Sequence, residues 1–150
     1  MQLHLFAIVV LGLMTGSELN VALFAHPILN RQPQETHILV RASLAALLGR
    51  VMPFWMAGST LLNLLLLLPI EHLRPTAWRL AAISFGIQVF AVVFSLVGPV
   101  PINNRILKWT PDSIPSDWKR QEHTWDVYHA VRTGALCVAF VLLTLCFRFT

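Results

Sequence analysis

Charged residues are scarce in this chain of 150 amino acids. They make up 12% of the sequence, whereas soluble globular proteins carry about 25%. Hydrophobic residues reach 56%, above the roughly 45–50% that is usual for globular chains. This combination excludes an ordinary soluble domain and predicts an integral membrane protein. We find no repeat or linker that would divide the chain, so we expect a single domain over residues 1–150.

Cysteines and cofactor motifs are scarce as well. Cys137 and Cys146 lie nine residues apart in one apolar run, so on a helix they face opposite sides and cannot form a disulfide with each other. The sequence contains no dinucleotide-binding fingerprint, phosphate-binding glycine loop, nucleophile elbow or haem attachment motif. The formal charge of +4 is scattered rather than gathered in a basic patch. We therefore expect neither a bound cofactor nor a nucleic-acid partner.

Four long apolar runs are present, at about residues 3–25, 53–70, 77–97 and 127–147. Each is close to the length of about 20 residues that crosses a bilayer as a helix. The first lacks a basic leading segment, which favours a retained membrane helix over a cleaved signal peptide. We expect it to end at His26-Pro27, and the third run to end at the double proline of 99–101.

Between the first two runs lies a helical segment, 36–50, that carries Arg41 and Arg50. These charges argue against deep burial, so the segment either lies along the membrane interface or extends the second span outward. The predicted fold is an all-α membrane four-helix bundle, with an interfacial helix after span 1 and a long loop before span 4. Asn63, in the second span, is expected to make an interhelical hydrogen bond.

A polar stripe enters the fourth apolar run. Spacings of four and three residues place its members on one helical face. It consists of Trp118, Glu122, Trp125, His129, Arg132 and Leu136. Ionisable groups are costly in hydrocarbon unless they pair, line a cavity or act in function. The alternative is a juxtamembrane helix with tryptophans at the interface and charges in water.

A second ionisable group lies deep in the first span. Glu18 precedes His26 by eight residues, or about 12 Å of helix rise. Four antiparallel spans bring the end of the first, the end of the third and the start of the fourth to one membrane face. The polar residues at these three ends are Glu18, His26, Asn103, Asn104, His129 and Arg132.

Three interpretations of this convergence remain open. Glu18 and Arg132 could form an ion pair that only holds the bundle together. A metal site could use Glu18, His26, His123 and His129, although the ligand spacings typical of metal sites are missing and Arg132 would place a cation beside the metal. In the third, His129 acts as a base and Arg132 holds a developing anion. We rank the metal site last and expect no bound metal.

The pattern of Asn103-Asn104, Trp109, Trp118, Trp125, His129 and Arg132 resembles the small four-span membrane proteins related to anthrone oxygenases, whose bacterial members are mostly of unknown function. The acidic Glu18 and the chain length fit the resemblance. It implies oxidation of an activated aromatic or quinol-like substrate by dioxygen through a base-formed enolate. In that chemistry His129 is the base, and Arg132 with the amides of Asn103 and Asn104 stabilises the oxyanion. Trp109, Trp118 and Trp125 wall the pocket for a hydrophobic aromatic molecule.

Two further expectations concern partners and orientation. Instead of an enzyme, the chain could be a non-catalytic accessory subunit of a larger membrane complex, or a homo-oligomer. Basic residues concentrate on the side of the 26–36 and 99–126 connections, so these loops should face the cytoplasm under the positive-inside tendency. The expected location is the inner membrane of a bacterium, with both termini outside the cytoplasm.

Overall fold

The computed structural model describes residues 2–68 and 74–149, and every regular element in these stretches is a helix. The elements in chain order are α1 (Gln2–Asn20), a π-helical turn η1 (Val21–Ala25), α2 (His26–Leu29), α3 (Gln34–Leu67), α4 (Pro75–Val97), α5 (Pro99–Ile106) and α6 (Trp118–Phe147). The predicted all-α fold is confirmed. Residues 69–73, where we placed the end of the second span and the start of a turn at Glu71, lie outside the described residues.

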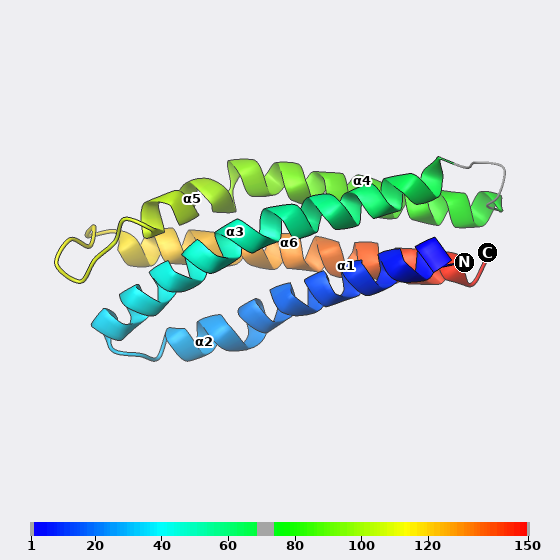
Figure 1. Ribbon diagram of the computed structural model, residues 1–150. Helices are drawn as coiled ribbons and strands as arrows, with labels where there is room; N and C mark the ends of the chain where they lie inside the picture. Colours follow the sequence, from blue (N-terminus) through cyan, green and yellow to red (C-terminus); the bar gives the residue numbers. More distant parts are fainter. Residues whose placement is uncertain (1, 69–73, 150) are drawn as a thin grey trace.

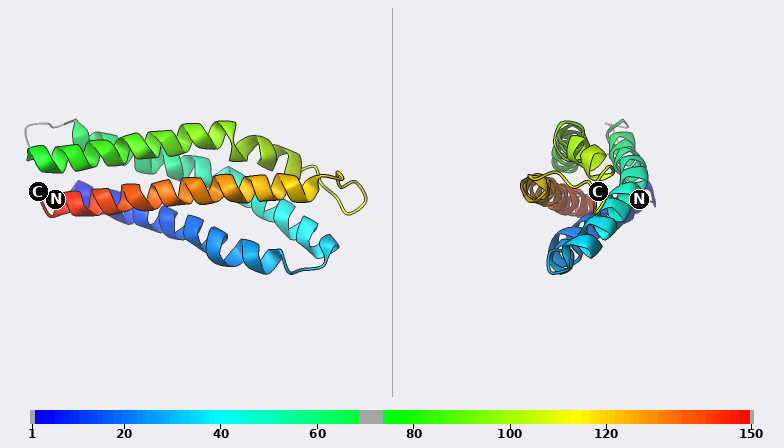
Figure 2. Two further views of the ribbon diagram at one scale, coloured as in Figure 1. Left: turned by 180° about the vertical axis from the view of Figure 1, so that it is seen from behind. Right: turned by 90° about the vertical axis from the view of Figure 1, so that its left-hand side faces the viewer.

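The long helices form a bundle in which successive helices run antiparallel (Figure 1). α6 packs against α4 and α1, and α3 packs against the same two helices. The chain ends lie together at one end of the bundle, which we call the terminal end. The α2–α3 and α5–α6 connections lie at the opposite end, the loop end (Figure 2). The predicted meeting of three span ends therefore occurs at the loop end.

Among the residues that the structure describes, four helical segments are long and apolar enough to cross a membrane: Gln2–Leu29, Gln34–Leu67, Pro75–Ile106 and Trp118–Cys146. Their outer faces expose large apolar side chains, including Phe54 and Val97. Helices satisfy their own backbone polar groups, so this surface is suited to lipid. Sequence and structure agree on an integral membrane four-helix bundle.

Inside the bundle, an apolar core near the terminal end surrounds a few polar groups. Leu11, Met14 and Leu143 are among its buried members. Asn63 Nδ2 donates to Ser84 Oγ over 3.1 Å, and Ser84 Oγ donates to the Ala139 carbonyl over 2.8 Å. These bonds join α3, α4 and α6, as predicted for Asn63.

We had expected the first span to end at His26-Pro27, but the structure shows that it does not. The helix continues through η1 and α2 to Leu29. A proline inside a helix lacks the N–H of the regular ladder and its ring crowds the preceding turn. The π-helical turn lies directly before Pro27, and in it the His26 N–H bonds to the Val21 carbonyl, five residues back. This wider turn lets the helix pass the proline.

The segment 36–50 is not a separate interfacial helix, which corrects the fold expected from the sequence. It is the first half of α3, which runs without interruption to Leu67 and contains Pro53. Pro53 cannot bond to the carbonyl of Gly49, but both residues lie on an exposed part of the helix. Prolines are tolerated in membrane helices where local adjustments satisfy the freed group. The second span is therefore extended outward, the other alternative we considered.

α4 ends just before the double proline, as expected, and a further helix, α5, follows at a bend. α4 stops at Gly98, whose φ is −102° and ψ −88°, and α5 starts at Pro99. Proline is suited to the first turn of a helix, where its missing N–H has no helical partner. A Cβ atom on Gly98 would lie 3.1 Å from the Phe94 carbonyl oxygen and from Tyr128 Cδ2. Because glycine has no Cβ atom, Phe94 and Tyr128 can lie close to this position, and the chain can bend between α4 and α5.

The predicted long loop connects α5 to α6, and α6 begins after Asp117. The Asp117 carboxylate accepts hydrogen bonds of 2.9 Å from Gln121 Nε2 and from Arg120 Nη2. These bonds, that from Gln121 first, lower the pKa of the Asp117 carboxyl below its ordinary value. From here α6 carries the polar stripe into the bundle.

Candidate functional site

A buried ion pair joins α1 to α6. Arg132 Nη2 donates to Glu18 Oε2 over 2.6 Å, and Arg132 Nη1 donates to Ser95 Oγ of α4 over 3.1 Å. Glu18 is 2% exposed and Arg132 is 7% exposed. The pairing proposed from the sequence is therefore present in the structure. Because both charges are out of contact with water, each depends on the other for its stability.

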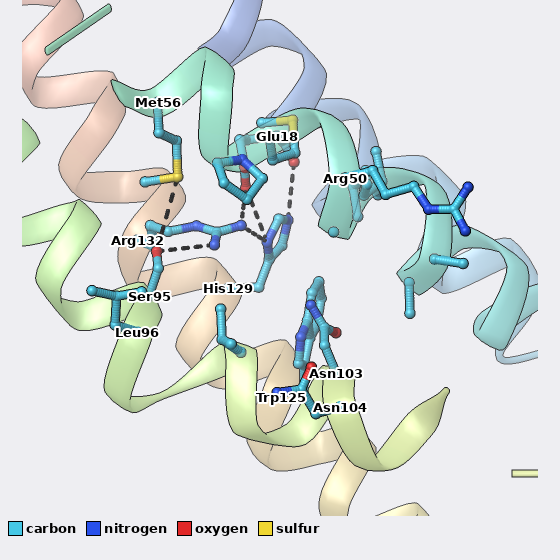
Figure 3. A pocket seen from close by; sticks show the side chains of 18 of the residues that line it. Glu18, Arg50, Met56, Ser95, Leu96, Asn103, Asn104, Trp125, His129 and Arg132 are labelled. Atoms are coloured by element: carbon cyan, nitrogen blue, oxygen red, sulfur yellow. Dashed lines mark hydrogen bonds and ion pairs between the residues drawn. The ribbon is translucent and has the colours of Figure 1, made fainter. Parts of the chain in front are cut away.

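His129 lies one turn before Arg132 and completes what we call the His129 cluster, namely Glu18, His129 and Arg132 (Figure 3). His129 Nε2 is 3.1 Å from the Glu18 backbone carbonyl, which can only accept, so Nε2 carries a hydrogen. His129 Nδ1 is 3.1 Å from both Arg132 Nη2 and Glu18 Oε2. A neutral ring accepts at Nδ1 from the guanidinium, whereas a protonated ring donates from Nδ1 to the carboxylate. Nδ1 thus has a partner in either protonation state.

A cavity of about 450 Å³ borders this cluster. Its wall is mostly apolar and is formed largely by α3, including Met52 and Met56. Trp125 contributes the aromatic wall from α6, and Asn103 and Asn104 contribute amides from α5. Volume and lining are those of a site for a small organic molecule.

The cavity opens at the side of the bundle. Gly49 and Pro53 of α3 line it and are exposed, as are Leu96 at the end of α4 and Leu107 just after α5. The opening therefore lies between α3 and the α4–α5 segment. Arg50 also lines the cavity, with its guanidinium directed away from the His129 cluster (Figure 3).

The three tryptophans of the predicted pocket occupy different places. Trp125 borders the cavity, whereas Trp109 is buried in an apolar group at the loop end with Ile102 and Ile106. Trp118 packs edge-on against His37, with ring centroids 5.3 Å apart. The structure therefore does not bring Trp109 or Trp118 to the cavity wall.

The side chains considered for a metal site are not assembled into one. His123 is exposed on α6, whereas Glu18 and His129 are buried together. His26 is engaged by Asp126 and Arg41. Within residues 2–68 and 74–149, no three His, Cys, Asp or Glu side chains are grouped in a way that could hold a metal ion.

A second group of buried ionisable side chains lies closer to the loop end and was not predicted. We call it the Arg41 cluster; its members are His26, His37, Arg41, Glu122 and Asp126. Arg41 is only 2% exposed, so the expectation that its charge would avoid burial is wrong, although Arg50 is exposed. Arg41 Nη1 donates to His26 Nε2 over 2.6 Å and Nη2 donates to Asp126 Oδ1 over 3.2 Å. These partners account for its burial.

His37 and Glu122 form the other half of the Arg41 cluster. His37 Nε2 is 2.6 Å from Glu122 Oε1, and His37 Nδ1 is 3.0 Å from the Leu29 carbonyl. The sequence carried a signal for these contacts. His37 and Arg41 are four residues apart, as are Glu122 and Asp126, so each pair occupies one helical face with charges that complement the other.

Trp125 separates the two clusters. The Arg41 guanidinium carbon lies 4.5 Å from the centroid of the Trp125 ring. The His129 ring stacks on Trp125 with centroids 4.6 Å apart and an interplanar angle of 14°. The orientation of His129 is therefore fixed by a hydrogen bond to α1, by the ion pair and by an aromatic stack.

Fold and site together define a helical membrane protein that encloses an apolar cavity with a buried imidazole, carboxylate and guanidinium at one wall. The chain belongs to the anthrone oxygenase family, whose model matches residues 44–142. The matched segment includes Asn103, Asn104, His129 and Arg132, but it begins after Glu18. No curated protein and no solved structure matches the chain.

Proposed function

We propose that this protein oxidises an activated aromatic methylene group with dioxygen, converting an anthrone-like substrate to the corresponding quinone. The observation that carries the proposal is the position of His129 Nδ1, between a carboxylate and a guanidinium at the wall of an apolar cavity. Membership in the anthrone oxygenase family supports the reaction class. The sideways opening of the cavity suits a substrate dissolved in the membrane.

His129 is the base in this proposal. The methylene hydrogens of an anthrone are acidic because their removal gives an aromatic enolate. His129 Nδ1 accepts the proton, and the Glu18 carboxylate at 3.1 Å stabilises the imidazolium that forms. Imidazole is the side chain that proteins use most often as a general base.

Arg132 and the neighbouring donors hold the negative charge of the enolate. Arg132 Nε and Trp125 Nε1 are buried N–H donors without a hydrogen-bond partner among the described residues. Both belong to side chains that line the cavity. Buried donors are normally paired, so the site has donor capacity left for substrate oxygens, together with the amides of Asn103 and Asn104.

The reaction balances with dioxygen as the oxidant. The enolate carbon is oxidised as it gives an electron pair to dioxygen, and a carbon–oxygen bond forms to a peroxide that takes up the first proton. Loss of the second methylene proton and cleavage of the oxygen–oxygen bond then give the new carbonyl and water. One dioxygen is consumed and one water is formed for each substrate.

The test uses the full chain in lipid nanodiscs, with anthrone and isotopically labelled dioxygen. We expect anthraquinone to form faster than in protein-free nanodiscs, with one labelled oxygen atom in the new carbonyl group. A rate equal to that of protein-free nanodiscs would contradict the proposal and favour the accessory-subunit alternative. Chelation of metal ions before the assay checks that trace metals do not cause the oxidation.

A further inference from the structure

A second, smaller cavity touches His129 from the α1–α6 side. It has a volume of about 120 Å³ and lies between η1–α2 and α6, where His26, Asn30 and Asp126 help to line it. Among the described residues that line the two cavities, His129 is the one that borders both. The imidazole thus stands between the larger cavity and a smaller, separate space that also contains polar side chains.

The smaller cavity is suited to water. A water molecule needs only about 10–15 Å³ of such volume, and it needs polar partners. The imidazole rings of His26 and His129 have centroids 5.8 Å apart, and the Asp126 carboxylate faces His26. Water in this space has the side chains of Asn30 and Asp126 as polar partners beside the His129 ring.

Asp126 is the most exposed ionisable side chain of this space. Its side chain is 31% exposed, whereas those of His26 and His129 are 7% and 3% exposed. Asp126 Oδ1 accepts from Arg41 Nη2 over 3.2 Å and from His26 Nδ1 over 2.9 Å. Because Arg41 Nη1 donates to His26 Nε2, the single hydrogen of a neutral His26 ring is on Nδ1 and points to Asp126. His26 and Arg41 thus hold the carboxylate in place.

We propose that Asp126 and water in the smaller cavity carry protons between His129 and the aqueous phase at the loop end. The protonated His129 ring releases to water its Nε2 proton, which otherwise bonds to the Glu18 backbone carbonyl. This water gives a proton to the Asp126 carboxylate, and Asp126 releases it to bulk water. No electrons move in these steps. The same steps in reverse carry a proton from bulk water to His129. The role of this path in catalysis rests on the proposed function, whereas the proton transfer itself does not depend on it.

The charges around the path are compatible with it. The ionisable side chains around the path belong to α1, α2, α3 and α6. They are Glu18, His26, His37, Arg41, Glu122, Asp126 and Arg132. Near His129 the charges of Glu18 and Arg132 offset each other. At the outer end, two carboxylates share the one guanidinium of Arg41. The contacts of Asp126 with His26 and Arg41 are both made by Oδ1, so Oδ2 is the oxygen that takes the proton. Asp126 is the relay group, and His26 and Arg41 are positioning residues.

The first experiment needs no substrate. In nanodiscs with nitrogen-labelled histidine, NMR measures how fast the His129 ring N–H exchanges with water. Asp126→Asn should slow this exchange by roughly tenfold or more, because an amide is a far weaker proton acceptor than a carboxylate. Asp126→Glu should largely restore it. Asp112→Asn is the matched control, since Asp112 is an exposed acid at the same end, and it should leave the exchange unchanged.

A second variant tests the space for water without changing any charge around it. Ala22→Leu adds volume at the wall of the smaller cavity and keeps every ionisable group, so it should also slow the exchange. Normal exchange in both Asp126→Asn and Ala22→Leu would overturn the proposal. Should Asp126→Asn fail to fold, the result for Ala22→Leu decides alone.

Anthrone then links the path to the reaction. In heavy water without dioxygen, deuterium enters the methylene group only if His129 exchanges its proton with solvent. Aerobic oxidation can instead return the proton to the peroxide, so Asp126→Asn should reduce deuterium entry more than oxidation. Equal losses would assign Asp126 a structural role and overturn the relay. If the wild type neither deuterates nor oxidises anthrone while Asp126 still controls the His129 exchange, the proposed function fails and the proton path stands.

Discussion

Arg132 and Glu18 bind α6 to α1 through a guanidinium–carboxylate contact of 2.6 Å, with both side chains buried. The same carboxylate oxygen lies 3.1 Å from His129 Nδ1. The pair therefore holds two helices together and also sets the electrostatic surroundings of the candidate base. Variants of Arg132 and Glu18 separate these two roles.

Arg132→Gln should destabilise the bundle by about 3–5 kcal/mol, because it leaves the Glu18 carboxylate buried without its partner. Thermal unfolding in nanodiscs measures the loss. Arg120→Gln is the matched control, since Arg120 is 80% exposed on the same helix and exposed pairs contribute little. Adding Glu18→Gln to Arg132→Gln should restore most of the stability but not the activity, since the anion-holding cation is still missing. Full activity of the double variant would exclude a catalytic role for Arg132.

His129→Gln should insert and fold, because a polar side chain of similar size replaces the imidazole. Turnover of anthrone should fall by roughly 10²–10⁴-fold, the range for a lost general base. His123→Gln, an exposed histidine on the same helix, should retain wild-type rates. A fully active His129→Gln protein would end the base hypothesis.

Leu96→Trp should obstruct the opening between α3 and the α4–α5 segment. We expect kcat/KM for anthrone to fall about tenfold, which corresponds to roughly 1.4 kcal/mol, with a smaller change in kcat. Val97→Trp adds the same bulk to the next residue, which is 73% exposed and lies outside the cavity lining. Equal effects of the two variants would show that the substrate enters elsewhere.

Gly12→Val should destabilise the contact between α1 and α6. A Cβ atom on Gly12 would lie 2.8 Å from Phe140 Cε2, and such overpacking costs typically about 1–3 kcal/mol. Gly16→Val is the control, because nothing lies within 4 Å of a Cβ atom there. Unfolding midpoints that shift equally for both variants would contradict the close approach.

The orientation of the bundle is tested with a reporter fused after Thr150. Seven basic residues lie toward the loop end, at Arg31, Arg41, Arg50, Arg105, Lys108, Lys119 and Arg120. Three lie toward the terminal end, at Arg74, Arg79 and Arg148. The positive-inside tendency then predicts a C-terminus outside the cytoplasm. A reporter active only in the cytoplasm would reverse this assignment.

Helical periodicity and alternating spans were enough to bring Glu18 and Arg132 to one membrane face and to make their pairing one of three interpretations. Both residues lie on regular helices, so phase and depth could be counted from the chain. The same counting placed Trp118 and Trp125 on one face, but seven residues also separate them by about 10.5 Å along the axis. Trp118 consequently lies beyond the cavity, next to His37. Two residues on the same helical face can lie at different depths in the bundle. Which of them borders the cavity depends on tertiary packing, which sets where the cavity ends.

The Arg41 cluster could not be predicted from rules that treat each helix alone. A single arginine argues against burial, and only partners from α2 and α6 reverse that argument. The proline at 27 was misjudged for a related reason. Whether a proline ends a helix depends on what satisfies the freed carbonyl and on the space beside the ring. The surrounding structure supplies both.

The π-helical turn η1 has a consequence for how relatives of this chain align. Glu18 and His26 are eight residues apart, and eight steps of about 100° in an uninterrupted α-helix would leave them roughly 80° out of phase. Both are nevertheless buried, because the wider turn absorbs one residue and returns His26 to the inner face. A homologue with one residue fewer within 21–25 would keep both side chains in place. When such a homologue is aligned with this chain, the single-residue gap falls within 21–25, inside the first membrane helix.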